Sequence, residues 1–259
     1  MKKFNTAAVC IPSKHYMVDL TGRVTEIRKM VDAGEYFTIN RARQYGKTTT
    51  INALVQALSD DYLMVSLSFE GLTDANFASE QSFVKAFCRM FKRNPALYQS
   101  LPVSIREQME DYISRREEKA EMDELFLTLE AWCGISDKPV VLLIDEVDSA
   151  ANNQVFLNFL GQLRDGYIRR ETAGTPAFHS VILAGVTDIK HLRQKIRKAD
   201  EHRENSPWNI AADFRLDMSL SEDGIKGMLD EYEADHATCM DTGASKTDKV
   251  LRTNVRCKD

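Results

Sequence analysis

The triplet Gly46-Lys47-Thr48 stands between a short apolar run and an amphipathic stretch of the chain. In a phosphate-binding loop this triplet ends a tight turn whose backbone N–H groups point inward, and the start of the following helix adds a positive partial charge. The lysine reaches the β- and γ-phosphates, and the next hydroxyl binds Mg²⁺. The pattern lacks its first glycine, because Arg41 occupies that place. The candidate phosphate-binding residues are Arg43, Gln44, Tyr45, Gly46, Lys47, Thr48 and Thr49.

Acidic residues close a second stretch, VVLLIDEVDSA, directly after its aliphatic run. A phosphate-hydrolysing site needs one acid at the end of a strand, beside the phosphate loop, to hold Mg²⁺ and its water shell, and a neighbouring carboxylate to orient and deprotonate the attacking water. We predict that Asp145 is a metal ligand together with Thr48, and that Glu146 is the base. Asp148 is a weaker candidate, because it could cap the following helix as easily as contact the substrate. A coincidental Gly-Lys-Thr and a strand ending in solvated acids are the alternatives, which the joint occurrence of the two motifs disfavours.

Polar residues also follow the next apolar run, SVILAGVTDIKHL. Thr187 or Asp188 could hydrogen-bond the attacking water or the γ-phosphate, and Asp188 fits a helix cap as well. The arginines just beyond allow three interpretations: an arginine finger for a neighbouring subunit, contacts to nucleic-acid phosphates, or a solvated basic helix, which we favour. These arginines are Arg193, Arg197 and Arg203.

The elements that would position these residues alternate along the chain. Apolar and β-branched runs predict strands at 35–40, 62–70, 138–150, 178–189 and 213–221. Helical spacing of apolar residues predicts helices at 21–34, 47–59, 153–171 and 222–236, and a mostly helical segment at 79–134. Strands that alternate with helices in this way indicate a parallel, doubly wound α/β sheet.

The composition is that of a globular protein, with 259 residues of which 43% are hydrophobic, and a net charge of −5. This charge argues against a chain that is basic all over, and the longest apolar runs are too short to cross a bilayer. Five cysteines without a CxxC pair, and a start without a signal-peptide apolar region, predict reduced thiols in a cytoplasmic protein. A metal site built from Cys10, Cys239 and His236 is disfavoured by their spacing.

Four segments together resemble the bacterial AAA-ATPase-like domain family, which often precedes a PD-(D/E)XK nuclease-like domain. They are HYMVDLTGRVTEIRKMVDAGEYFTINRARQYGKTTT, VVLLIDEVD, SVILAGVTDIKHL and NSPWNIAADFRLDMSLS, in this order. The resemblance covers about residues 4–240.

The resemblance implies a P-loop NTPase fold, a three-layer α/β/α sandwich with a mainly parallel sheet of the additional-strand, AAA-like type. It implies that the strand carrying Asp145 stands between the P-loop strand and its neighbour. The family's phosphate loop matches Gly46-Lys47-Thr48, and its acidic strand end matches Asp145-Glu146. Loops of this family commonly lack the first glycine, so Arg41 is expected as a family trait.

We expect an AAA-ATPase-like P-loop domain over residues 1–240 and a loose polar tail over 241–259. Relatives continue there into further helices and a lid over the nucleotide, so we expect a truncated or frame-altered C-terminus.

The predicted function is that of an ATP-binding P-loop protein, a Mg²⁺-dependent ATPase if the lid is not essential. The alternatives are a nucleotide-sensing or DNA-associated scaffold with little or no hydrolysis, and a folded remnant that does neither. Further expected partners are a second copy of the chain, DNA, or a nuclease-like domain, and no membrane.

Overall fold

The structure is a computed structural model that describes residues 2–5, 10–40, 47–115, 121–150, 153–185, 208–214, 216 and 222–236. The chain divides into two compact units. Unit 1 comprises Met1–Ile27, Arg43–Gln56 and Leu216–Asp259, and unit 2 comprises Arg28–Ala42 and Ala57–Arg215. Each unit is described by itself below.

Unit 2 contains a four-stranded sheet in which every pair of neighbours is parallel, in the order β1-β4-β3-β2. The strands are β1 (Tyr36–Asn40), β2 (Leu63–Ser68), β3 (Val140–Asp145) and β4 (Ser180–Gly185). The register aligns Asn40 with Gly185 and Ser68 with Asp145. The carboxyl ends of all four strands therefore meet at one edge of the sheet. These strands confirm the α/β fold and four of the predicted strand positions.

The order of the strands corrects one expectation. The strand carrying Asp145 is not the neighbour of β1, because β4 lies between β1 and β3. All six residues of β3 and all six of β4 are buried. Strands that are apolar throughout are stable where both faces are covered and both edges are paired, which is the situation of these two central strands. The additional strand, which lies between β1 and the strand carrying Asp145, is thus β4.

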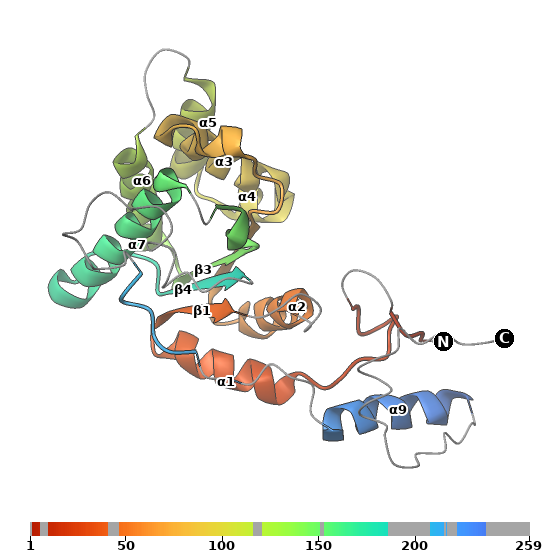
Figure 1. Cartoon of the computed structure of the whole chain (residues 1–259). Helices are drawn as coiled ribbons and strands as arrows, with labels where there is room; N and C mark the ends of the chain where they lie inside the picture. The colour runs from red at the N-terminus through yellow and green to blue at the C-terminus, as the bar shows by residue number, and fades with distance from the viewer. Residues whose placement is uncertain are drawn as a thin grey trace, which may run out of the picture. The chain divides into compact units, whose positions relative to one another are not determined.

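One face of the sheet is covered by helices of unit 2 (Figure 1). They are η1 (Asp74–Phe77), α3 (Glu80–Arg93), α4 (Pro95–Ser100), α5 (Val103–Ser114), α6 (Met122–Ile135), η2 (Val147–Ala150) and α7 (Gln154–Ala173). The predicted helical segment 79–134 is divided by two prolines, because the residue before a proline disfavours helix. Asn94 is extended and its side chain caps α4, while Leu101 is extended before Pro102.

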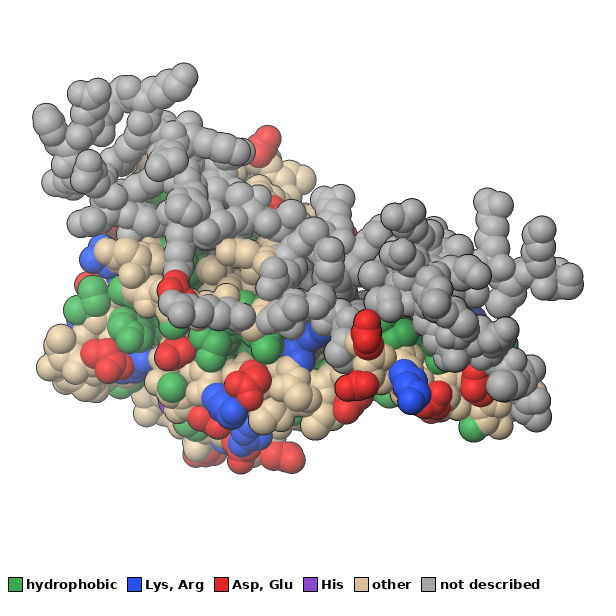
Figure 2. Space-filling model, turned by 60° about the horizontal axis from the view of Figure 1, so that its bottom comes forward, with side chains coloured by type: hydrophobic (Ala, Val, Ile, Leu, Met, Phe, Trp, Pro, Cys, Tyr) green, Lys and Arg blue, Asp and Glu red, His purple; other side chains and the backbone are tan. Residues whose placement is uncertain are grey.

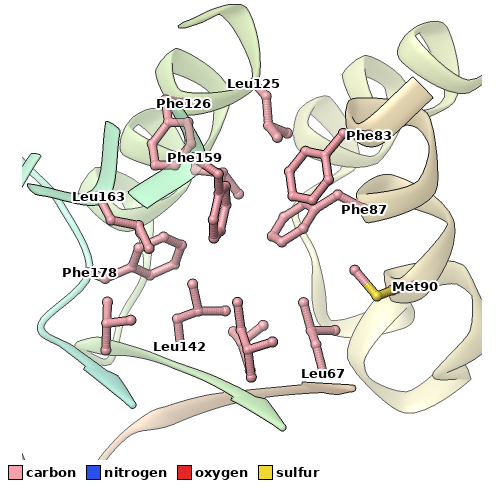
Figure 3. Packing of buried hydrophobic residues seen from close by; sticks show 14 of the residues in the cluster. Leu67, Phe83, Phe87, Met90, Leu125, Phe126, Leu142, Phe159, Leu163 and Phe178 are labelled. Atoms are coloured by element: carbon pink, nitrogen blue, oxygen red, sulfur yellow. The ribbon is translucent and has the colours of Figure 1, made fainter. Parts of the chain in front are cut away.

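Aromatic rings from three helices form the core on that face (Figure 3). Phe83 of α3 and Phe126 of α6 lie 5.2 and 5.5 Å, between ring centroids, from Phe159 of α7. Below them, Leu67 and Leu142 rise from the sheet (Figure 3). The alternate strand residues of the opposite face are equally buried: Phe37, Ile39, Val141, Leu143 and Ile182 are at most 1% exposed. Both faces are therefore covered, as expected for a three-layer fold.

Two helices begin in unit 1 and end in unit 2: α1 (Thr21–Asp32) and α2 (Lys47–Leu58). The turn after α1 depends on Gly34, whose φ of 69° is readily adopted only by glycine. Unit 1 also contains α9 (Glu222–His236), on which Tyr232 packs against the ring of Tyr16 at 5.3 Å. These helices and α7 confirm the predicted ones.

Most of the predicted strand 213–221 lies outside the described residues. Just before it, Ala212 forms an isolated parallel bridge to Phe37. The tail 241–259 also lies outside them. Among the described helices, none has the length and apolarity needed to span a bilayer.

The amino edge of the sheet is closed by Arg170 of α7. Its guanidinium donates to the carbonyl oxygens of Phe178 (2.6 Å), Gly34 (2.8 Å) and His179. It also lies over the rings of Tyr36 and Tyr167, at 5.4 and 5.0 Å from their centroids. A planar fork of five donors suits this task, and a lysine ammonium cannot reproduce it.

Replacing Arg170 with methionine is expected to lower the free energy of unfolding by about 2–4 kcal/mol, because the carbonyl groups of Gly34 and His179 lose a charged donor, while that of Phe178 keeps the Tyr36 hydroxyl. Urea unfolding measures the change. Arg89→Met is the matched control, since Arg89 is exposed on α3 and its loss should cost less than about 0.5 kcal/mol. Equal costs for the two variants would contradict this role of Arg170.

His179 follows in the same edge and stacks on Tyr62, with 5.3 Å between ring centroids. Burial, together with the nearby charge of Arg170, lowers the pKa of His179, against the opposing effect of a hydrogen bond to the Val31 backbone. Its Nε2 is buried and has no hydrogen-bond partner among the described residues. A second proton on this ring would therefore be poorly accommodated.

Since the folded pKa of His179 lies below its unfolded value near 6.5, the unfolded chain binds more protons at acid pH. The contribution of the neutral ring to stability is complete above about pH 6.5 and is lost as the pH falls below it. We expect His179→Gln to reduce the fall of the melting temperature between neutral and mildly acid pH. His236→Gln controls for the loss of an imidazole elsewhere, and an unchanged slope in His179→Gln would refute the expectation.

Candidate functional site

The carboxyl edge of the sheet in unit 2 carries the acidic residues that the sequence singled out. Asp145 is the last residue of β3 and is 7% exposed. Its Oδ1 accepts a hydrogen bond from the backbone N–H of Glu146 at 2.8 Å, and its carbonyl accepts from the N–H of Phe69 at 2.9 Å. The carboxylate is thus held by its own turn, and the backbone of Asp145 by the chain that follows β2. One well-fixed carboxylate, with waters completing the shell, is a donor set that suits Mg²⁺.

Glu146 has a left-handed backbone conformation with a φ of 56°, which no other non-glycine residue in the described parts of the chain shares. This conformation brings the Cβ of an L-residue close to its own carbonyl, at a cost of about 1–2 kcal/mol. Such strain persists only where the surrounding structure imposes it, and it gathers at functional sites. The observation agrees with a catalytic role for Glu146.

The turn after Glu146 continues into the short helix η2 (Val147–Ala150), whose two end residues are fully buried. The hydroxyl of Ser149 lies 3.0 Å from the carbonyl oxygen of Glu146 and 3.0 Å from that of Phe69, just beyond β2. Because a hydroxyl has one proton, it shares or alternates its donation between the two. Sequence reasoning missed Ser149, since a serine after an acidic motif carries no signal by itself.

Asp148 lies against the last residue of β4. A Cβ added to Gly185 would meet the Asp148 carboxylate at 2.8–3.1 Å, so only glycine leaves room for it there. Asp148, which follows β3, thus lies against the end of β4. From the sequence, a helix cap and a contact with substrate were both open for this residue. No local signal in the sequence identifies this contact, because it depends on how β3 and β4 are paired.

Asn40 ends β1 at the same edge and was not predicted as a site residue. Its Oδ1 is buried and has no hydrogen-bond partner among the described residues, while its Nδ2 is 3.4 Å from the hydroxyl of Thr38. A buried acceptor without a donor is costly. A polar residue that ends the strand before a candidate phosphate loop is the signal that could have identified it.

The phosphate-loop motif lies in unit 1, where α2 begins at Lys47 as predicted. Thr48 is exposed in the first turn. The hydroxyl of Thr49 accepts a hydrogen bond from the N–H of Cys10 at 3.4 Å, and that of buried Thr50 accepts from Arg23 at 3.1 Å. The first turn is thereby tied to the N-terminal segment and to α1. The predicted role of Thr49 toward the nucleotide stays a prediction.

Several predicted site residues lie outside the described residues. They are Arg41, Arg43, Gln44, Tyr45, Gly46 and the side chain of Lys47 in the loop, and Thr187, Asp188, Arg193, Arg197 and Arg203 after β4. Because the loop motif and the acidic edge belong to different units, the expected approach of Lys47 to Asp145 stays a prediction.

The described cysteines are free thiols: Cys10, Cys88 and Cys133. Burial raises the pKa of Cys88 and of Cys133 to about 12, which keeps both protonated and unreactive. No group of three or more histidine, cysteine or acidic side chains that could hold a metal occurs within the described ranges. Cys239 lies outside them.

Three solved structures resemble the chain. The ORC1 protein of Aeropyrum pernix, in complex with DNA, is 8% identical with a TM-score of 0.47, over 85% of this chain and 50% of that one. Drosophila ORC bound to poly(dA/dT) DNA and Cdc6 is 13% identical with a TM-score of 0.45, over 82% and 30%. Cdc6p from Pyrobaculum aerophilum is 14% identical with a TM-score of 0.48, over 83% and 49%. The chain thus spans half or less of each of these proteins.

None of the curated protein sequences matches the chain. The family model of an AAA-like domain matches residues 4–238, which is nearly the whole length and includes every predicted site residue. On this match, the chain belongs to the AAA-like domain family of P-loop NTPases.

Proposed function

We propose that the chain is a Mg²⁺-dependent ATPase module. The observation that supports this most strongly is the strained turn at Glu146, which directly follows a metal-ligand candidate, Asp145, at the end of a buried central strand. A plain structural turn would place glycine or asparagine at such a φ. A carboxylate retained there at a cost in stability is accounted for by a role in chemistry.

In this proposal the phosphates are bound by the loop amides, by Lys47 and by residues Arg43–Thr49 around it. Thr48 and Asp145 hold the metal, and Mg²⁺ when bound neutralises charge on the phosphates. Glu146 accepts the proton of the attacking water. Thr187 or Asp188, which follow β4 by two and three residues, hydrogen-bond the water or the γ-phosphate.

The alternative function, a nucleotide-sensing or DNA-associated scaffold, finds no specific support in the described residues. On the face shown in Figure 2, acidic and basic side chains are interspersed among the described residues rather than gathered into a basic patch. The basic run 190–203 lies outside the residues that the structure describes. Tight ATP binding without phosphate release would favour the scaffold. Self-association and a nuclease-like partner stay predictions.

Mg-ATP at about a hundredfold excess over its dissociation constant is expected to raise the melting temperature by about 5–10 °C. Lys47→Ala should abolish this shift, because the lysine charge on the phosphates is lost. Lys138→Ala is the matched control, since Lys138 precedes β3 and its Nζ donates to the Ser59 carbonyl at 2.9 Å. No shift in the unmodified chain would contradict nucleotide binding.

Glu146→Gln is expected to retain the ATP-induced shift and to lose phosphate release by about 10²–10⁴-fold, because the amide cannot accept the proton of water. Single-turnover release of phosphate measures the loss. Glu107→Gln, an exposed position on α5, should hydrolyse ATP at the normal rate. Normal release by Glu146→Gln would show that another group activates water.

A further inference from the structure

We propose that Ser149 is a positioning residue that holds Glu146 in its left-handed conformation and thereby places the Glu146 carboxylate toward water. This inference rests on the proposed ATPase function and deepens it, because it identifies what keeps the base in place. It concerns unit 2 alone, where every residue involved is described.

The Ser149 hydroxyl lies within hydrogen-bond distance of two carbonyl oxygens, one in the turn and one in the chain that follows β2. It lies 3.0 Å from the Glu146 oxygen and 3.0 Å from the Phe69 oxygen. The Ser149 backbone N–H also donates to the Glu146 oxygen at 3.3 Å. The carbonyl of the strained residue is therefore bonded to η2 by the Ser149 N–H, and by the Ser149 hydroxyl when its single proton is not donated to the Phe69 oxygen.

The other described attachments of the turn act on its entry and its exit. Asp145 accepts the Glu146 N–H, which constrains the entry to the residue, and buried Val147 and Ala150 anchor η2. The orientation of the peptide after Glu146 is set by where its carbonyl points, and the Ser149 side chain bonds to that oxygen. Without the hydroxyl, the Glu146 oxygen keeps the Ser149 N–H at 3.3 Å, and we expect this longer bond to let the turn relax toward a less strained conformation.

A relaxed turn would redirect the Cα–Cβ bond of Glu146 and move its carboxylate. A displacement of about 1 Å at a reacting group can reduce the rate up to about a hundredfold. We expect the affinity for nucleotide to stay unchanged, since the loop and α2 contain the main groups proposed to bind phosphate. The inference thus predicts an effect on turnover that is separate from affinity.

The first test measures single-turnover ATP hydrolysis and ATP affinity of the full chain carrying Ser149→Ala. We expect turnover to fall by roughly tenfold or more with unchanged affinity. Ser149→Thr should restore turnover, because a threonine hydroxyl can bond to a carbonyl three residues earlier. Ser114→Ala is the matched control, since the Ser114 hydroxyl donates to the Asp111 carbonyl at the same spacing and at 3.0 Å. Normal turnover in Ser149→Ala, or a parallel loss of affinity, would overturn the inference.

The second test needs no nucleotide, so it decides the inference even if the chain proves not to hydrolyse ATP. Glu146→Gly removes the strain and should raise the melting temperature by about 2–4 °C. This gain should shrink or vanish in a Ser149→Ala background, where the turn has already relaxed, and persist in a Ser114→Ala background. An equal gain in all three backgrounds would show that Ser149 does not hold the turn. Absence of phosphate release in the unmodified chain would instead count against the proposed function.

Discussion

The burial of β3 and β4 on both faces and along both edges is the constraint on which the rest of unit 2 depends. Every residue of these strands is buried, so within them a charge would lose its water without gaining a partner. The first place where such groups are tolerated is the end of the strand. Asp145 occupies that place on β3. The acidic edge is thus a consequence of the central position of the strand as much as of the residues themselves.

The same constraint explains why strain falls on Glu146. Pairing with β2 continues up to Asp145 opposite Ser68, which fixes the direction of the chain as it leaves the sheet. Val147, two residues later, is completely buried in the core and fixes where the chain must go. The change of direction between these two anchors falls on one residue. Glu146 makes it with a positive φ, and the bonds of its N–H and carbonyl hold it there.

Much of this architecture could be predicted from the sequence. Aliphatic runs and helical spacing placed β1, β3, β4, α2 and α7, because burial on one or both faces leaves a direct pattern in the residues. The order of the strands could not be predicted from the same pattern, since apolarity reports burial but not which strand is the neighbour. The neighbour expected for β3 was taken from the family resemblance instead, and it was wrong, because β4 lies between β1 and β3.

The contacts made by Asp148 and Ser149 were equally inaccessible to the sequence. They depend on the register of β2, β3 and β4, which no local motif encodes. Asp148 needs Gly185 beside it, and Ser149 needs the carbonyl of Phe69, which follows β2 and lies 80 residues away in sequence. The roles of Lys47, Thr187 and Asp188 stay predictions, because their side chains lie outside the described residues.

Each edge of the sheet contains a buried polar atom without a hydrogen-bond partner among the described residues, Nε2 of His179 at the amino edge and Oδ1 of Asn40 at the carboxyl edge. At the amino edge, the guanidinium of Arg170 supplies donors to three carbonyl groups. At the carboxyl edge, the buried Oδ1 of Asn40 has no donor among the described residues. A cost of this kind is tolerated where a donor arrives from a neighbouring segment or from bound water. The chain leaves Asn40 directly into the candidate phosphate loop, and the strained residue Glu146 follows the end of β3 at the same edge. This is the edge where parallel α/β sheets bind their ligands.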